Sequence, residues 1–354
     1  MKYVKSNNNQ FITGLKITVE NYFSNKKINK YGNFAIAIKG IIVLFIYGLA
    51  YASIFRPGAS ATSLLTAYIV MGISGVMIVF NLVHDASHQA ISKTKWINKS
   101  VCYLGDLVGI NTYIWNIRHN IQHHTFTNVL GGDLIIENIP LIRLSPHQAL
   151  KKFHKYQVYY APLFYMFYSF YWMFVIDFKL FLKKDICNLH NIKHPFKEWM
   201  ILILTKSFYI FYMVVVPWFF TSLSFISVVG YFFILHFAAG LLLSFVAVLG
   251  HFVDGPSFPD APNGLIENSW SEHELEATID FAPRSRIINW ITGGLNTHVA
   301  HHLFPHICHI HYYQLTRIIE DYCQKNNYQY NKESLSGGLS SHFRYLKKLS
   351  NPEI

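Results

Sequence analysis

Residues 293–306 read GGLNTHVAHHLFPH, and three histidines in this stretch stand at helical spacing. His298, His301 and His302 occupy positions i, i+3 and i+4, so a helix places them on one face. Imidazole is the commonest metal ligand among side chains, which makes this face a candidate metal site. Alone, the triplet is a modest signal, and its meaning depends on the rest of the chain.

Two further histidine clusters lie upstream. His84 and His88 are spaced i, i+4, and so are His119 and His123, with His124 adjacent. A lone pair at this spacing is weak evidence in a chain with 19 histidines, whereas three clusters at expected helix ends are strong evidence. Hydrogen-bonded core or interfacial histidines are the alternative interpretation, which fits most other histidines of the chain. Eight imidazoles exceed the needs of one ion, so two ions fit better, and ligand type leaves zinc, copper, iron and nickel open.

Polar residues beside the clusters are candidates to orient the imidazoles through hydrogen bonds. For each of them an ordinary cap or turn role is equally open. These candidates are Asp85, Asp106, Asn111, Asn128, Asp133 and Asn296.

The composition indicates a membrane protein. Only 14% of the 354 residues are charged, against about a quarter in a soluble domain. The net charge of +11 comes from basic residues that flank apolar runs, which is typical of the positive-inside rule rather than of nucleic-acid binding. The four cysteines form no close pair, so we expect no disulfide framework and a reducing compartment.

Four apolar stretches are long enough to span a bilayer as helices, at about residues 34–55, 64–83, 199–220 and 225–250. Short connections join them into two hairpins. A fifth apolar stretch, at about 159–176, has lysines on both flanks, which predicts an interfacial helix. Four crossings put every histidine cluster on the cytoplasmic side, whereas five would divide the clusters across the bilayer.

Three polar residues lie within these spans. Lys39 is expected to snorkel to the interface, and Lys206 to snorkel or to face protein. His236 is either a functional residue or the partner of a hydrogen bond between neighbouring helices. We therefore expect an all-α integral membrane protein, with a cytosolic N-terminal arm at 1–33. A single domain at 34–354 would then carry a cytosolic helical cap around a dimetal site.

The sequence resembles the membrane fatty acid desaturase family, in particular its bacterial front-end, linoleoyl-CoA-desaturase-like branch. The resemblance is carried by HDASH at 84–88, by WNIRHNIQHHTFTN at 115–128 and by the stretch at 293–306, and it extends over roughly residues 35–345. It implies a diiron centre and a ninth histidine after the last span, a place that His251 fits. His298 stands where front-end members commonly carry glutamine, and Ala247 where a related structure type has an asparagine. The metal ligands expected are His84, His88, His119, His123, His124, His251, His298, His301 and His302, with no catalytic residue beyond them.

The function implied by the resemblance is fatty acyl desaturation. A cis double bond would be introduced with dioxygen and two external electrons, supplied by a ferredoxin or a cytochrome b5-type donor at the basic face. The acyl chain would be linked to lipid, coenzyme A or a carrier protein, and the location would be a bacterial inner membrane with the site on its cytoplasmic side. We expect an apolar tunnel lined by Tyr113, Trp115, Phe126 and Trp290.

Two other functions stay open from the sequence. A hydroxylase or ketolase on the same diiron scaffold would carry the same histidines. A metal transporter, which is less favoured, would distribute ionisable residues through the spans instead of gathering histidines at one face.

Overall fold

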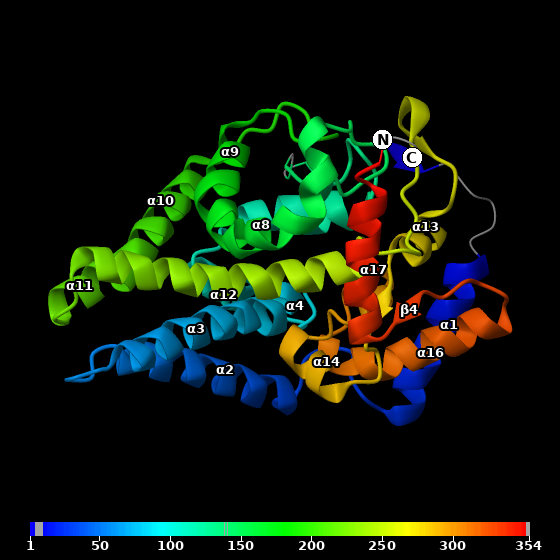
Figure 1. Ribbon diagram of the computed structural model, residues 1–354. Helices are drawn as coiled ribbons and strands as arrows, with labels where there is room; N and C mark the ends of the chain where they lie inside the picture. The colour runs from blue at the N-terminus through cyan, green and yellow to red at the C-terminus, as the bar shows by residue number, and fades with distance from the viewer. Residues whose placement is uncertain (4–9, 138, 140, 352–354) are drawn as a thin grey trace.

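The computed structural model describes residues 1–3, 10–137, 139 and 141–351, and it is predominantly helical. Four helices are long and apolar enough to cross a membrane: Phe34–Ser53, Ala61–Ser87, Phe196–Phe220 and Phe225–His251. The expected spans are therefore present, with bounds that differ by up to four residues. In Figure 1, α12 (Phe225–His251) lies between α8 (Gln157–Tyr171) and α3 (Ala61–Ile78), and α2 (Phe34–Ser53) packs on the far side of α3.

Side-chain caps set where these helices begin. The side chain of Asn33 accepts a hydrogen bond from the backbone N–H of Ala35 at the start of α2. Ser60 caps α3 and Ser224 caps α12 in the same way. A capping oxygen satisfies one of the first free N–H groups of a helix, so these polar residues fix where the helices start. Ser60 and Ser224 lie in the turns of the two hairpins.

Among the described residues, four short stretches are π-helical; three lie within longer helical rods, and one follows the short helix Thr112–Trp115. They are Val79–Val83, Asn116–His123, Trp172–Ile176 and Phe211–Val215. Two of them deliver histidines: the first ends just before His84, and the second contains His119 and His123. A π-turn rotates the residues that follow it relative to an α-helix, and such turns occur frequently at functional sites.

The fifth apolar stretch forms one continuous helical rod. It consists of α8, the π-helix Trp172–Ile176 and α9 (Asp177–Leu182). This rod is longer at both ends than the expected 159–176, and α8 packs along α12. Gly240 of α12 permits the close approach, because a Cβ atom there would lie 2.3 Å from the carbonyl oxygen of Met166.

The polar residues within the spans are buried in protein. The expectation that Lys39 snorkels is wrong: the residue is 6% exposed, and its Nζ lies 3.0 Å from Nε2 of His309. Lys206 faces protein, with its Nζ 2.7 Å from Asp177 Oδ2. His236 bonds across helices, with Nδ1 3.0 Å from Ser169 Oγ, as one of the two interpretations predicted.

A cap of short helices surrounds one end of the long helices, at the right of Figure 1. Its core joins α1 (Gln10–Lys26) to α13 (Trp270–Ala277) and α16 (Tyr312–Lys325) through buried residues such as Phe11, Leu15 and Leu315. Two parallel pairs of two-residue strands complete the cap, β1 (Lys2–Tyr3) with β2 (Leu265–Ile266) and β3 (Asp280–Phe281) with β4 (Lys332–Glu333).

The remaining helical segments complete the second and third spans, connect the spans and form the rest of the cap. They are α4 (His84–Ser87), α5 (Lys95–Leu107), α6 (Thr112–Trp115), α7 (Leu134–Glu137), α10 (Phe196–Ile210), α11 (Val216–Phe220), α14 (Arg286–Thr292), α15 (His298–Leu303) and α17 (Leu335–Lys348), with short 3₁₀ turns at Lys152–Tyr156, Pro262–Gly264 and His309–His311.

Candidate metal centre and substrate cavity

The fold brings all nine expected histidines together at the cap end of the long helices. Within each of three groups, one possible ligand atom per residue lies within 4.8 Å of the others. The first group is His84, His88, His119 and His301, and the second is His123, His251, His298 and His302. His124 forms the third group with His301 and His302, so it lies where the first two groups meet.

The histidines reach the site from four separate parts of the chain. His84 follows the π-turn near the cap end of the second long helix, and His251 is the last residue of α12. His301 and His302 belong to α15, which begins after the left-handed residues Gly293 (φ 61°) and Gly294 (φ 76°). A Cβ at Gly293 would lie 2.3 Å from the carbonyl oxygen of Phe80, so only glycine lets the third cluster pack this close to the second long helix.

Several imidazole nitrogens have no hydrogen-bond partner among the described residues. Both ring nitrogens of His301 are buried and unpaired. The same holds for Nε2 of His88 and Nε2 of His302. Burial lowers the pKa of His301 and His302 well below 6.5, and it lowers that of His298 to about 3. Neutral imidazoles with free lone pairs are the form that binds metal ions, so the donor set fits a metal centre.

Hydrogen bonds at Nδ1 orient the second group. Nδ1 of His123 lies 2.9 Å from Asp133 Oδ2, and Nδ1 of His302 lies 2.6 Å from Glu274 Oε2. Nδ1 of His251 and of His298 lie 3.1 and 3.0 Å from backbone carbonyl oxygens. Each contact leaves Nε2 for the centre of the site, where Nε2 of His298 and His251 converge to 2.7 Å.

Of the six polar residues expected to orient imidazoles, Asp133 has this role by geometry. Asp85 binds His309 at 2.8 Å and lies 3.8 Å from Nδ1 of His84. The other four follow the alternative of a cap or turn role, because their hydrogen bonds go to backbone or non-histidine groups: Asp106 to Thr112, Asn111 within the cap of α6, Asn128 to Ser257 and Ala277, and Asn296 to Ala282 and Asn289.

Sequence reasoning missed Glu274. Its carboxylate is buried among the histidines, and burial raises its pKa well above 4.5. The residue lies in SEHELEA at 271–277, beside three other acidic or imidazole groups. In the sequence, Glu274 is only a carboxylate on a short expected segment before the third cluster. Because it lies 28 positions before His302, local spacing does not predict that the two side chains pair.

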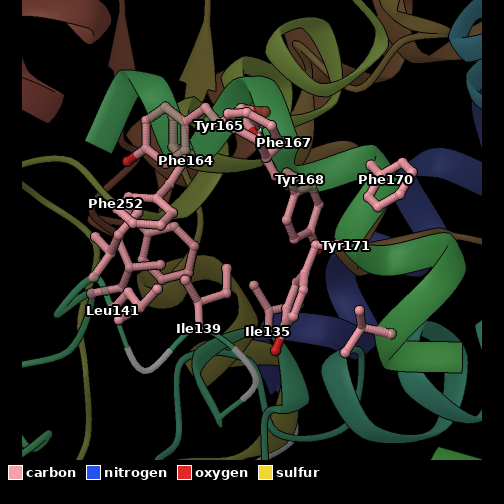
Figure 2. A pocket seen from close by; sticks show the side chains of 16 residues that line it. Ile135, Ile139, Leu141, Phe164, Tyr165, Phe167, Tyr168, Phe170, Tyr171 and Phe252 are labelled. Atoms are coloured by element: carbon pink, nitrogen blue, oxygen red, sulfur yellow. Dashed lines mark hydrogen bonds between the residues drawn. The ribbon is translucent and has the colours of Figure 1, made fainter. Parts of the chain in front are cut away.

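Two adjacent chambers share wall residues, and the inner one reaches the histidines. The outer chamber has a volume of about 360 Å³ and an apolar lining. Figure 2 shows residues of α8, including Phe164, Phe167 and Tyr168, on one side of this chamber, with Ile135, Ile139 and Leu141 on the other. The inner chamber, of about 80 Å³, shares Ile135, Tyr168 and Ala247 with the outer one. Histidines of both groups of four line it: His84, His119, His123, His251 and His298.

Of the four aromatic residues expected to line the cavity, one does so. Trp115 lines the inner chamber. Tyr113 instead bonds His194, Phe126 stacks on Tyr3, and Trp290 lies against Lys39. Aromatic residues near the clusters were too numerous to separate the cavity lining from packing.

Comparisons with known proteins agree with this geometry. The model of the fatty acid desaturase family matches residues 59–334. The chain is 33% identical to the sn-1 linoleoyl-lipid 6-desaturase of Arthrospira platensis, over 88% of this chain and 85% of the relative. It is 32% identical to the Synechocystis protein of the same name, over 94% and 93%, and 28% identical to the acyl-lipid (8-3)-desaturase of Physcomitrium patens, over 100% and 74%.

The chain belongs to the fatty acid desaturase family. It is accordingly an integral membrane oxidoreductase that acts on fatty acyl chains. Members of this family generally require iron, and the histidine groups are able to bind metal ions.

Proposed function

We propose that this protein is an acyl-lipid desaturase whose nine clustered histidines hold two iron ions. One observation carries the proposal: five imidazoles, drawn from both groups of four, line an inner chamber that adjoins a larger apolar one. His84, His88, His119 and His301 would hold one ion, and His123, His251, His298 and His302 the other, with His124 at their junction.

An unactivated methylene has no acidic proton, so its hydrogen is not removed by acid–base chemistry. When bound, the two ions would supply the redox chemistry that lets dioxygen oxidise such a chain. The balanced reaction takes two hydrogen atoms from adjacent carbons, together with two electrons and two protons, and reduces dioxygen to two water molecules. The acyl chain gains one cis double bond.

The residues of the chain bind and orient the substrate. The walls of the outer chamber exclude water and favour a methylene chain. They come from α8 on one side and from Ile135, Ile139, Leu141, Ile142 and Leu144 on the other. The inner chamber restricts which carbons lie beside the histidines. Fixing the reacting carbons against the centre contributes to rate and to regioselectivity.

The mouth of the outer chamber supports a lipid-linked substrate. Leu141, Phe164 and Phe167 are 37–44% exposed there, and no lysine or arginine among the described residues lines this chamber. A coenzyme A phosphate would require such cations. The relatives named above are lipid 6-desaturases and an acyl-lipid desaturase, which agrees with a substrate taken directly from the bilayer.

The electrons would come from an acidic carrier protein, either a ferredoxin or a cytochrome b5-type protein. A groove of about 920 Å³ carries Lys16, Lys27, Lys30 and Lys93, against a single acidic residue, Glu20. Phe304, two residues after His302, lies in its floor. Complementary charge would steer the donor to this face. The orientation proposed is a bacterial inner membrane with the cap in the cytoplasm, which follows the positive-inside rule.

Expression in a bacterium that makes no polyunsaturated lipids tests this function. The wild-type chain should create a new double bond, visible as a new peak in gas chromatography–mass spectrometry of the membrane fatty acids. His302→Ala should abolish the peak, and His190→Ala, at an exposed histidine outside the site, should retain it. A hydroxylated or oxo fatty acid in place of the alkene would identify the hydroxylase or ketolase instead.

A further inference from the structure

Three residues that line the inner chamber each carry a buried N–H group without a hydrogen-bond partner among the described residues. The groups are Nε1 of Trp115, Nε1 of Trp172 and Nη1 of Arg118. Indole and guanidinium nitrogens only donate, so none of the three satisfies another. Because buried polar groups in folded proteins nearly always have a partner, these donors indicate a ligand that accepts hydrogen bonds.

Arg118 also carries a buried charge that no acid among the described residues pairs with. The side chain is 4% exposed, and its Nη2 donates to the neutral hydroxyl of Tyr168. Burial raises the pKa of the Asp177 carboxyl, while Lys206 and, more weakly, Arg118 lower it. However, Oδ2 of Asp177 lies 2.7 Å from Nζ of Lys206, so one carboxylate faces two cations. A buried cation without a counter-charge is costly, which indicates a negative charge beside Arg118.

The three side chains form one stack that is already fixed in place. The rings of Trp115 and Trp172 lie 4.9 Å apart at an angle of 21°, and the Arg118 guanidinium lies 4.8 Å from the Trp172 ring. Stacking and the hydrogen bond to Tyr168 hold the donors before any ligand arrives, so that binding orders few additional side chains.

The size and lining of the inner chamber limit the ligand. A water-sized group needs about 10–15 Å³. The chamber has about 80 Å³, which admits a small ion but not a lipid headgroup or a nucleotide. No carboxylate among the described residues lines it, and its remaining walls are the imidazoles and apolar side chains such as Phe80, Leu243 and Val246. The apolar walls leave room for methylene groups beside such an ion.

We propose that the stack of Trp115, Trp172 and Arg118 binds a small monovalent inorganic anion of the size of chloride. An anion accepts hydrogen bonds and donates none, so it complements donor-only groups, and it balances the charge of Arg118. A water molecule would satisfy the donors but leave that charge unbalanced. The site does not depend on the proposed function, because neither the donors nor the charge require an acyl substrate.

The bound anion would lie beside the histidines. The ring of Trp115 lies 4.6 Å from that of His119, and the same chamber is lined by His84 and His123. Metal ions held by neutral imidazoles keep their full positive charge, and a nearby anion lowers the electrostatic cost of placing them there. The anion is therefore a counter-ion for Arg118 and for any metal ion in the centre.

Chlorine-35 NMR of the purified protein in detergent tests the site. Chloride that exchanges with a protein site gives a broader line than chloride in the same detergent alone. The wild type should broaden the line, and titration with bromide should narrow it again. The excess broadening should fall at least fivefold in Arg118→Gln. It should fall equally in Trp115→Phe/Trp172→Phe, which keeps the aromatic rings but loses both N–H groups.

Three further variants are controls. Arg344→Gln and Trp218→Phe, at side chains that are 60% and 43% exposed, should broaden the line as the wild type does. His302→Ala removes an expected metal ligand but leaves the stack, so it should retain most of the broadening.

Three results would overturn the proposal. Full broadening in both Arg118→Gln and Trp115→Phe/Trp172→Phe would place the chloride elsewhere on the protein. Loss of the broadening in His302→Ala alone would place it on a metal ion. No excess broadening by the wild type would make water the partner of the donors. None of these measurements requires substrate or turnover, so their outcome is independent of whether the protein desaturates acyl chains.

Competition with a chromogenic chelator tests the link to the metal centre. The wild type should hold metal at least threefold more tightly in chloride than in the same concentration of gluconate, which is too large for the chamber. Arg118→Gln should hold metal equally in both salts, because coupling between two ligands is reciprocal and is lost with the anion site. Equal affinity of the wild type in both salts would contradict the shared counter-ion.

Discussion

Hydrogen bonds to Nδ1 decide which nitrogen of each histidine faces the proposed metal ions. Asp133 and Glu274 supply these bonds to His123 and His302, and both carboxylates are buried. A carboxylate behind a histidine orients its ring and makes it a stronger ligand, so the second group depends on two acidic residues that lie outside every histidine cluster.

Asp133→Asn and Glu274→Gln should each weaken metal binding about tenfold to a hundredfold while the helical fold is retained. The amide keeps the size of the side chain but loses the charge that strengthens the ligand. Competition with a chromogenic chelator measures this affinity. Glu276→Gln, at an exposed glutamate that bonds Asn268, is the control. Unchanged affinity in both test variants would show that the orienting bonds contribute nothing.

Buried neutral histidines outside the metal centre should make stability depend on pH. Burial lowers the pKa of His342 to about 4, where Nδ1 lies 2.6 Å from the carbonyl oxygen of Phe252. Below pH 6.5, His342 binds a proton in the unfolded chain but stays neutral in the native state until the pH approaches 4. The free energy of unfolding should therefore fall as the pH drops from 6.5 to 4, by on the order of 3 kcal/mol for this site.

Denaturant titrations in detergent at pH 7.5, 5.5 and 4.5 measure this effect. In His342→Gln the curve of stability against pH should be shallower than in the wild type, and in His190→Gln, at an exposed histidine, it should be unchanged. A parallel curve for His342→Gln would contradict the assignment.

The identity of the site histidines could be predicted from the sequence because their spacing repeats and their family pattern is specific. Eight came from helical spacing, and His251 from the resemblance alone. Glu274 and the buried contact of Lys39 with His309 could not be predicted, since both pairings join residues far apart in the chain. Local pattern carries no information on which distant side chain faces an imidazole.

At the scale of elements, the contact of α8 with α12 shapes the outer chamber. Gly240 lies at this contact, where an added Cβ would meet the carbonyl oxygens of Met166 and Tyr165 at 2.3 and 2.5 Å. Small residues let membrane helices approach closely, and Tyr165 is itself part of the chamber wall. The shape of the cavity therefore depends on Gly240 having no side chain.

Gly240→Ala should destabilise the protein by about 1–3 kcal/mol, because the helices must separate to admit the methyl group. It should also reduce conversion of long acyl chains. Thermal unfolding in detergent and the fatty acid profile provide the two measurements. Gly230→Ala, in the same helix but with nothing within 4 Å of its Cβ position, should be neutral. Equal stability of the two variants would contradict the close packing.

The four long helices could be predicted because apolar length and polar caps are local properties. The π-turns could not, since Val79–Val83 and Asn116–His123 have no distinguishing residue pattern. Their position is set by tertiary contacts that turn the histidines inward. The rod from α8 to α9 was expected to be shorter, because the charged residues after Ile176 concealed its continuation to Leu182.

For the whole molecule, chain topology gathers the chemistry at one end of the long helices. The first and third histidine clusters lie more than 200 positions apart in sequence, yet His84 and His301 have ring centroids 4.4 Å apart. This convergence could be anticipated from the two-hairpin arrangement, which returns every cluster to one side. The two chambers could not be anticipated from the sequence, since they depend on the packing of α8, α12 and the segment around Ile135.

The central claim is that these nine histidines form a centre for two iron ions. Metal analysis of the purified protein by inductively coupled plasma mass spectrometry, after expression in iron-supplemented medium, tests it most directly. We predict two iron ions per chain, and about one in His301→Ala, which removes a ligand of the first group and leaves the second group intact. Zinc without iron in a wild-type preparation that retains desaturase activity, or two irons in His301→Ala, would contradict the account.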